Sequence, residues 1–156
     1  MSEKRKDNPG VIAPPPLIFA TGLIVGGFVA WHYPRPIMAS GAAVVLGFLL
    51  VLFGLVVIFV AWRQMKAAKT NIEPWHPTTA ILDSGIYAVS RNPIYVAMVE
   101  IYLGFSLIFN SVWFLPFLPL VVLAIHFGVI RREERYLEAK FGEEYLDYKS
   151  RVRRWI

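Results

Sequence analysis

Two polar clusters in the second half of the chain contain residue types that suit a small-molecule binding site. The first is the run Ser-Arg-Asn-Pro-Ile-Tyr at 90–95, and the second begins with Glu133 and Glu134. Asn92 precedes a proline, which biases it away from helix and leaves its amide able to meet a ligand, and the planar Arg91 guanidinium can hold a carboxylate through two hydrogen bonds. The chain between the clusters is mainly apolar. If it forms a membrane hairpin, both clusters return to one face of the bilayer and can form one polar site.

The composition is that of an integral membrane protein. Of 156 residues, 56% are hydrophobic, and the mean hydropathy is +0.52. This is too apolar for a soluble domain of the same size, and the apolar residues come in long blocks. Because a spanning helix needs about 20 mainly apolar residues, the blocks predict an all-α protein with four spans. These are expected at 17–33, 38–62, 95–109 and 112–130.

Lysine and arginine lie almost entirely on one side of these spans. If the amino terminus is cytoplasmic, fifteen of the sixteen are on the cytoplasmic side, and Arg35 alone is outside. Such an excess marks the cytoplasmic side, so we expect both termini and the long middle loop there, in a protein of the plasma (inner) membrane. The net charge of +5 comes from lysines and arginines that determine the topology and lie beside anionic lipid headgroups. It therefore does not indicate a nucleic-acid partner.

The chain divides into three segments. We expect a disordered cytoplasmic tail over 1–14, a first transmembrane hairpin over 15–62, and a core over 63–156 with the middle loop, a second hairpin and the C-terminal helices. The loop at 69–85 is long for a connector, and it is either part of a site or an interfacial linker. The absence of cysteine excludes disulfides, thiolate metal sites and cysteine nucleophiles, and we expect no metal.

Glycines in the first hairpin predict close helix packing, since a residue without a side chain lets two helices approach. They are Gly22, Gly26, Gly41, Gly47 and Gly54.

An aromatic and apolar stripe follows the last span. Its members are spaced four, four and three residues apart, which predicts an amphipathic helix or helix pair at the membrane interface. Glu133 and Glu134 precede the stripe, among arginines. They are either ion-paired for structural reasons or form a polar pocket with the turn at 91–93. The stripe consists of Leu137, Phe141, Tyr145 and Tyr148.

Two ionisable residues lie inside predicted spans. Glu100 is in the third span and His126 in the fourth. Such residues are costly in hydrocarbon and are candidates for function. Two interpretations remain open, because they could pair with each other or line a wet cavity that receives a substrate.

Taken in order, these motifs resemble the C-terminal half of the isoprenylcysteine carboxyl methyltransferase family, which is related to membrane phospholipid methyltransferases. The match covers about residues 70–156 and rests on Gly-x-Tyr at 85–87, the run at 90–95, and Glu-Glu-x-x-Leu followed by Phe-Gly-x-x-Tyr-x-x-Tyr from Glu133 onward. The resemblance implies that the core is a methyltransferase. It would take S-adenosylmethionine from the cytosol and a lipophilic acceptor from the bilayer, such as a prenylcysteine carboxylate, a phospholipid or another lipid.

The resemblance also implies a cofactor site, formed by the middle loop, the second hairpin and the C-terminal helices. As catalytic candidates, Arg91 would position an anionic acceptor, and Glu100 and His126 would act as bases if the acceptor must lose a proton. Cofactor contacts, carried over by position, fall on Asn71, Thr79, Ala80, Ile81, Leu82, Tyr87, Asn92, Pro93, Ile94, Tyr95 and Glu133.

The sequence departs from the family pattern at two positions. Many members have Arg-His-Pro where this chain has Arg-Asn-Pro at 91–93. Asn92 can still form hydrogen bonds, but it lacks the titrating imidazole of histidine. An arginine that holds the substrate carboxylate in eukaryotic members falls about where Val129 stands. This weighs against a prenylcysteine carboxylate as the acceptor.

The sequence leaves two alternatives to a methyltransferase. Sterol reductases that use NADPH are similar in the C-terminal hairpin, but a dinucleotide phosphate calls for a basic cluster, whereas the middle loop is nearly neutral. The second alternative is a non-catalytic membrane scaffold. A scaffold would not require the ordered set of Tyr87, Arg91, Asn92, Tyr95 and Glu133.

The orientation can be tested with single cysteines, because the chain has none. We expect an impermeant thiol reagent added outside the cell to label Arg35→Cys, and to leave Lys66→Cys and Lys149→Cys unlabelled. Labelling at 66 and 149 but not at 35 would overturn the predicted orientation.

Overall fold

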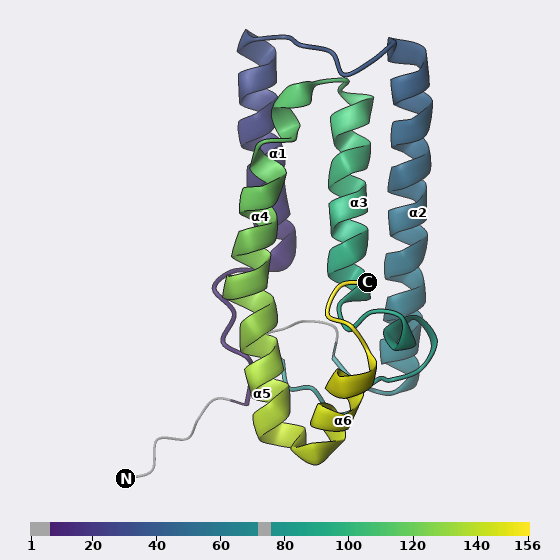
Figure 1. Ribbon diagram of the computed structural model, residues 1–156, viewed down its shortest axis with the longest axis vertical. Coiled ribbons are helices and arrows are strands. Elements are labelled where there is room, and N and C mark those ends of the chain that lie inside the picture. Colours follow the sequence, from purple (N-terminus) through teal and green to yellow (C-terminus); the bar gives the residue numbers. More distant parts are fainter. Residues whose placement is uncertain (1–6, 72–75) are drawn as a thin grey trace.

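The computed structural model describes residues 7–71 and 76–156, and every regular element within them is helical (Figure 1). This confirms the all-α fold class. In chain order the α-helices are α1 (Pro15–His32), α2 (Ser40–Ala67), α3 (Pro93–Ile108), α4 (Phe117–Ile125), α5 (Arg131–Phe141) and α6 (Glu143–Arg151). Two 3₁₀ turns, Gly85–Ala88 and Val112–Phe114, precede α3 and α4, and a π-helical turn, His126–Ile130, joins α4 to α5.

Three described helices are long and apolar enough to cross a membrane. They are Pro15–His32, Gly41–Ala67 and the continuous run Val112–Phe141. The predicted span at 95–109 corresponds to α3, which begins two residues earlier at Pro93 and has 16 residues. Proline at its first position has the required φ and needs no hydrogen bond there. In Figure 1, α3 lies between α2 and α4.

Glycines bring α2 and α3 into backbone contact. A Cβ at Gly47 would lie 2.7 Å from the Gly104 carbonyl oxygen, and one at Gly54 would lie 2.9 Å from the Ala97 carbonyl oxygen. No larger residue fits there without moving the backbone. The expectation that Gly41 also packs a helix is wrong, because a Cβ at Gly41 would meet nothing within 4 Å.

The glycines of α1 let it pack closely against α3, α4 and the turn before α4. A Cβ at Gly22 would meet Val121 and Tyr102, and one at Gly26 would meet Phe114. Tyr102 is 1% exposed, and its hydroxyl donates to the Phe114 carbonyl at 2.9 Å. The core therefore joins α1, α3 and α4, and the buried hydroxyl of Tyr102 is satisfied inside it.

The connections of the two hairpins meet at the end of the bundle opposite α5 and α6. Asn110 adopts a left-handed φ of 46° after α3, a conformation that asparagine tolerates. Its side-chain oxygen accepts from the backbone nitrogens of Ile37 and Met38 at 3.0 and 3.2 Å. The hairpins are thereby held in register.

The chain folds back on itself beyond α4. Gly142, at a φ of 55°, turns the chain between α5 and α6, and the segment after α6 returns to the start of α3 (Figure 1). There the Arg91 backbone nitrogen donates to the Arg153 carbonyl at 3.0 Å. The two polar clusters of the sequence thus meet at one end of the bundle.

Candidate functional site

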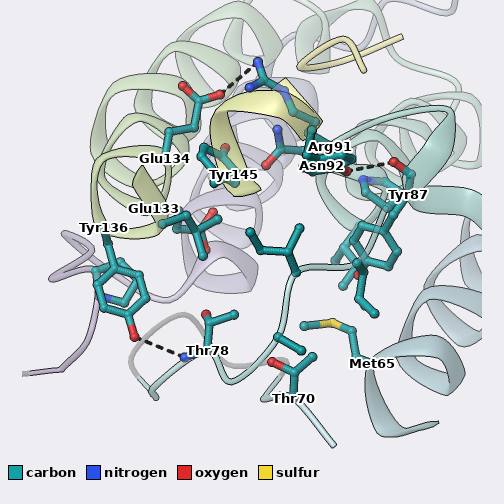
Figure 2. A pocket seen from close by; sticks show the side chains of 18 of the residues that line it. Met65, Thr70, Thr78, Tyr87, Arg91, Asn92, Glu133, Glu134, Tyr136 and Tyr145 are labelled. Carbon is teal, nitrogen blue, oxygen red and sulfur yellow. Dashed lines mark hydrogen bonds and ion pairs between the residues drawn. The ribbon is translucent and has the colours of Figure 1, made fainter. Parts of the chain in front are cut away.

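A pocket opens at the α5–α6 end of the bundle, where segments far apart in the sequence converge (Figure 2). Its walls come from the middle loop, the turn before α3, and helices α5 and α6. Arg91 and every predicted cofactor residue except Thr79 line it, namely Asn71, Ala80, Ile81, Leu82, Tyr87, Asn92, Pro93, Ile94, Tyr95 and Glu133. The chain therefore brings these residues together in space.

The turn before α3 is braced by the C-terminal segment. The Asn92 backbone nitrogen donates to the Ser90 hydroxyl at 3.1 Å, and the Asn92 side-chain nitrogen donates to the Arg154 carbonyl at 2.8 Å. The side-chain nitrogen of Asn92 thus holds the turn, which leaves the amide oxygen as the group able to accept from a ligand.

Glu134 carries the ion pairs of the site. One carboxylate oxygen lies 3.2 Å from the Arg91 Nη2, and Arg154 donates to both oxygens, at 2.8 and 2.7 Å. The side chains of Arg91 and Glu134 are only 8% and 9% exposed. The two hydrogen bonds that Arg154 donates to Glu134 raise the pKa of the Arg154 guanidinium. This network joins α5, the turn before α3 and the C-terminal segment.

Glu133 has a different partner. The Tyr95 hydroxyl donates to its Oε1 at 2.8 Å, and no cation among the described residues lies within ion-pair distance of it. Both interpretations of the acidic pair are therefore realised, by different residues. Glu134 is the structural ion-pair partner, while Glu133 faces the pocket with Tyr95.

Arg91 keeps unused hydrogen-bonding capacity. Its Nη2 pairs with Glu134, but its buried Nε and Nη1 have no hydrogen-bond partner within the described residues. Buried donors without a partner are costly, and they need an explanation. Because Arg91 lines the pocket, an anionic group of a ligand would satisfy them.

Tyrosines form a neutral wall. The Tyr148 hydroxyl donates to the Tyr87 carbonyl at 2.7 Å, and Tyr145 and Tyr148 pack edge to face. Burial raises the pKa of the Tyr87, Tyr145 and Tyr148 hydroxyls, so all three stay protonated at physiological pH. The wall excludes water without adding charge.

Three predicted site residues lie away from the pocket. Thr79 ties the interior of the middle loop to its start, donating from its backbone to the Thr70 hydroxyl at 3.1 Å and from its own hydroxyl to the Lys69 carbonyl at 2.8 Å. Glu100 and His126 do not pair, because no hydrogen bond joins them in the described part of the chain. The Glu100 Oε2 is buried without a partner, and the His126 ring packs edge-on against Phe127.

Sequence reasoning missed several lining residues. A signal was present for four of them. The sequence leaves Glu134 open as an ion-pair partner or as part of a pocket, and it marks Leu137, Tyr145 and Tyr148 as an interface stripe. Tyr136, which lies between Glu134 and Leu137 on α5, belongs to neither motif. Pro9, Met65, Thr70 and Thr78 carry no motif, and only the path of the folded chain brings them to the pocket.

Known proteins share this part of the chain. The family model described as phospholipid methyltransferase matches residues 42–144. An uncharacterized protein of Haemophilus influenzae is 42% identical over 64 residues, which cover 40% of this chain and 100% of that protein. The protein-S-isoprenylcysteine O-methyltransferase of Saccharomyces cerevisiae is 29% identical over 120 residues, which cover 74% of this chain and 49% of the yeast enzyme. The aligned region thus spans about half the length of the yeast enzyme.

The buried network predicts a large difference between two substitutions on one helix. Glu134→Gln removes the charge that compensates Arg91 and Arg154, and we expect it to lower the free energy of unfolding by about 3–5 kcal/mol. Glu138→Gln is the matched control, since the ion-pair partner of Glu138 among the described residues is the partly exposed Lys149, and this substitution should cost about 0–1 kcal/mol. Denaturant unfolding of both variants in detergent measures the difference, and equal losses would show that the Glu134 network holds nothing together.

Proposed function

The chain belongs to the phospholipid methyltransferase family, and on that premise we propose that it transfers a methyl group from S-adenosylmethionine to a lipophilic acceptor in the membrane. The observation that carries the proposal is the convergence of the middle loop, the turn before α3 and α5 on one pocket. Among the residues that line it, Glu133 has no ion-pair partner in the described part of the chain, and the buried Arg91 has two nitrogens without a described hydrogen-bond partner.

The residues of the pocket fit such a cofactor. Glu133 can accept hydrogen bonds from an amino or hydroxyl group, and the amide oxygen of Asn92 can do the same. The apolar side chains of Ile81, Leu82 and Leu137 offer a surface for a flat purine ring. We therefore assign the cofactor site to the lining residues that the sequence predicted.

The chemistry asks mainly for alignment. When bound, S-adenosylmethionine supplies a methyl group on a positively charged sulfur, and that charge is lost during an in-line displacement. The protein must therefore align the acceptor and exclude water, rather than supply a nucleophile. Tyr87, Tyr145 and Tyr148 exclude water, and the free donors of Arg91 orient an anionic group of the acceptor.

We further propose four spans, with α3 as the shortest. At 1.5 Å per residue, its length is about 24 Å, which is less than a typical hydrocarbon core. Two observations support the fourth span. The hairpin connections are hydrogen-bonded to each other through Asn110, so α3 covers the same layer as its neighbours, and its glycine contacts with α2 extend along its length. The lysine and arginine distribution supports a cytoplasmic position for the pocket and both termini.

The acceptor is proposed to arrive from the bilayer. Glu100 lies on α3 within the membrane-spanning bundle and away from the pocket, and its Oε2 has no partner among the described residues. A lipid-borne group can reach that depth, so Glu100 and His126 are assigned to the acceptor. Val129 is fully buried in the core and offers no charge to a carboxylate, which favours a phospholipid or another lipid over a prenylcysteine.

Calorimetry on the detergent-solubilised protein tests the proposal. We expect S-adenosylhomocysteine to bind and NADPH not to bind. Glu133→Gln and Tyr95→Phe should each weaken S-adenosylhomocysteine binding by about 1.5–3 kcal/mol, which is roughly 10- to 150-fold in the dissociation constant, because each removes a hydrogen bond that involves a charge.

Glu100→Gln is the matched control for Glu133→Gln. It should leave the affinity for S-adenosylhomocysteine unchanged and lower methyl transfer to membrane lipids, as expected of a residue that meets the acceptor alone. Binding of NADPH in place of S-adenosylhomocysteine would contradict the proposed function, and an unchanged affinity in Glu133→Gln would remove Glu133 from the site.

A further inference from the structure

The described residues that precede α1 lie against the site. The sequence predicts that they belong to a disordered tail. In the structure, residues 7–12, here called the N-terminal strap, run beside the π-helical turn and α5 (Figure 1). Pro9 of this strap lines the pocket. One wall of the proposed cofactor site thus comes from a segment outside the matched region at 42–144.

The Tyr136 hydroxyl is the first anchor of the strap. It donates to the Asp7 carboxylate at 2.7 Å and accepts from the Lys140 Nζ at 2.9 Å and from the Thr78 backbone nitrogen at 3.2 Å. A tyrosine hydroxyl has one donor and two acceptor sites, so all three are used. Tyr136 also lines the pocket, as Figure 2 shows. This one hydroxyl therefore joins the strap, the middle loop and α5.

The π-helical turn is the second anchor. The Ile12 backbone nitrogen donates to the Gly128 carbonyl at 3.2 Å, and a Cβ at Gly128 would lie 2.2 Å from the Ile12 Cδ1. The Arg132 Nη1 donates to the Gly10 carbonyl at 3.0 Å. Turns of this kind are rare in proteins, and many of those known lie at functional sites. Here the turn and the missing side chain of Gly128 together create a seat for the strap.

The anchors are weak enough to release. Lys140 and Asp7 are 28% and 58% exposed, and Ile12 is 56% exposed. Exposed ion pairs contribute little, so the strap is held in place by a few hydrogen bonds and by the packing of the partly buried Val11 against the core. A wall held in this way can open when a ligand enters or leaves.

We propose that the N-terminal strap is a movable wall of the pocket, and that its two anchors set how fast the cofactor product leaves. This inference rests on the proposed function, because it concerns the same site. Tyr136 and Gly128 are then positioning residues, which act through the strap. Gly128 is the cleaner probe, since it does not line the pocket.

The test measures release of S-adenosylhomocysteine from the full-length protein in lipid nanodiscs by stopped-flow. We expect Gly128→Ala and Tyr136→Phe each to speed release about 3- to 10-fold, the effect of losing one or two ordinary hydrogen bonds. Adding Ile12→Ala to Gly128→Ala removes the atoms that the new Cβ meets and should return the rate toward that of the wild type. Gly41→Ala, which meets nothing, is the control and should release at the wild-type rate.

A second measurement follows the strap without any ligand. Asn8→Cys should react faster with a thiol reagent when Gly128→Ala is also present, because the strap then leaves its seat. Wild-type release rates in both anchor variants, with S-adenosylhomocysteine still bound, would overturn this inference and leave the proposed function intact. Unchanged labelling of Asn8→Cys in the Gly128→Ala background would also overturn it. A wild-type protein that binds no S-adenosylhomocysteine would instead overturn the proposed function.

Discussion

One carboxylate, that of Glu134, holds the site together. It lies buried between Arg91, at the turn before α3, and Arg154, near the end of the chain. Separating any of these charges would leave the others uncompensated in a poorly solvated place. The same carboxylate therefore sets the position of α5 against α3 and keeps the C-terminal segment beside the turn. Because Arg91 has only one nitrogen engaged in this network, the interaction that builds the site also leaves two donors for a ligand.

The neighbouring Glu133 shows how one helix separates structure from function. Adjacent residues on an α-helix point about 100° apart, so Glu134 can face the arginines while Glu133 faces Tyr95. This arrangement depends on the bundle underneath. The Gly47 and Gly54 contacts hold α3 close to α2, and Tyr102 joins α3 to the core with α1 and α4. Only with α3 in that place does Tyr95 reach Glu133.

The sequence was most informative where a residue carries its own local signal. The predicted span at 95–109 lies within two residues of α3, and all five residues of the Arg-Asn-Pro-Ile-Tyr run line the pocket. The division of roles between Glu133 and Glu134 could not be predicted, because the bidentate partner of Glu134, Arg154, is brought back only by the turn at Gly142. Thr79 is assigned to the site by position, but in the folded loop it is exposed and bonds back to Lys69 and Thr70 at the start of the loop.

The strap and the span count illustrate the same limit. Nothing in the composition of residues 7–12 marks a wall of a pocket, since its anchors are a backbone carbonyl in a π-helical turn and a tyrosine hydroxyl more than a hundred positions away. Hydropathy alone cannot decide whether the 16-residue α3 crosses the membrane, because its depth is set by the helices beside it.

Amide hydrogen exchange with and without S-adenosylhomocysteine tests the central claim most directly, namely that three distant segments form one cofactor site. The account predicts that the ligand slows exchange together at 78–82, at 91–95 and in α5 from Glu133 to Leu137. Slowed exchange confined to one of these segments, or centred on the middle of α3 around Glu100, would contradict it.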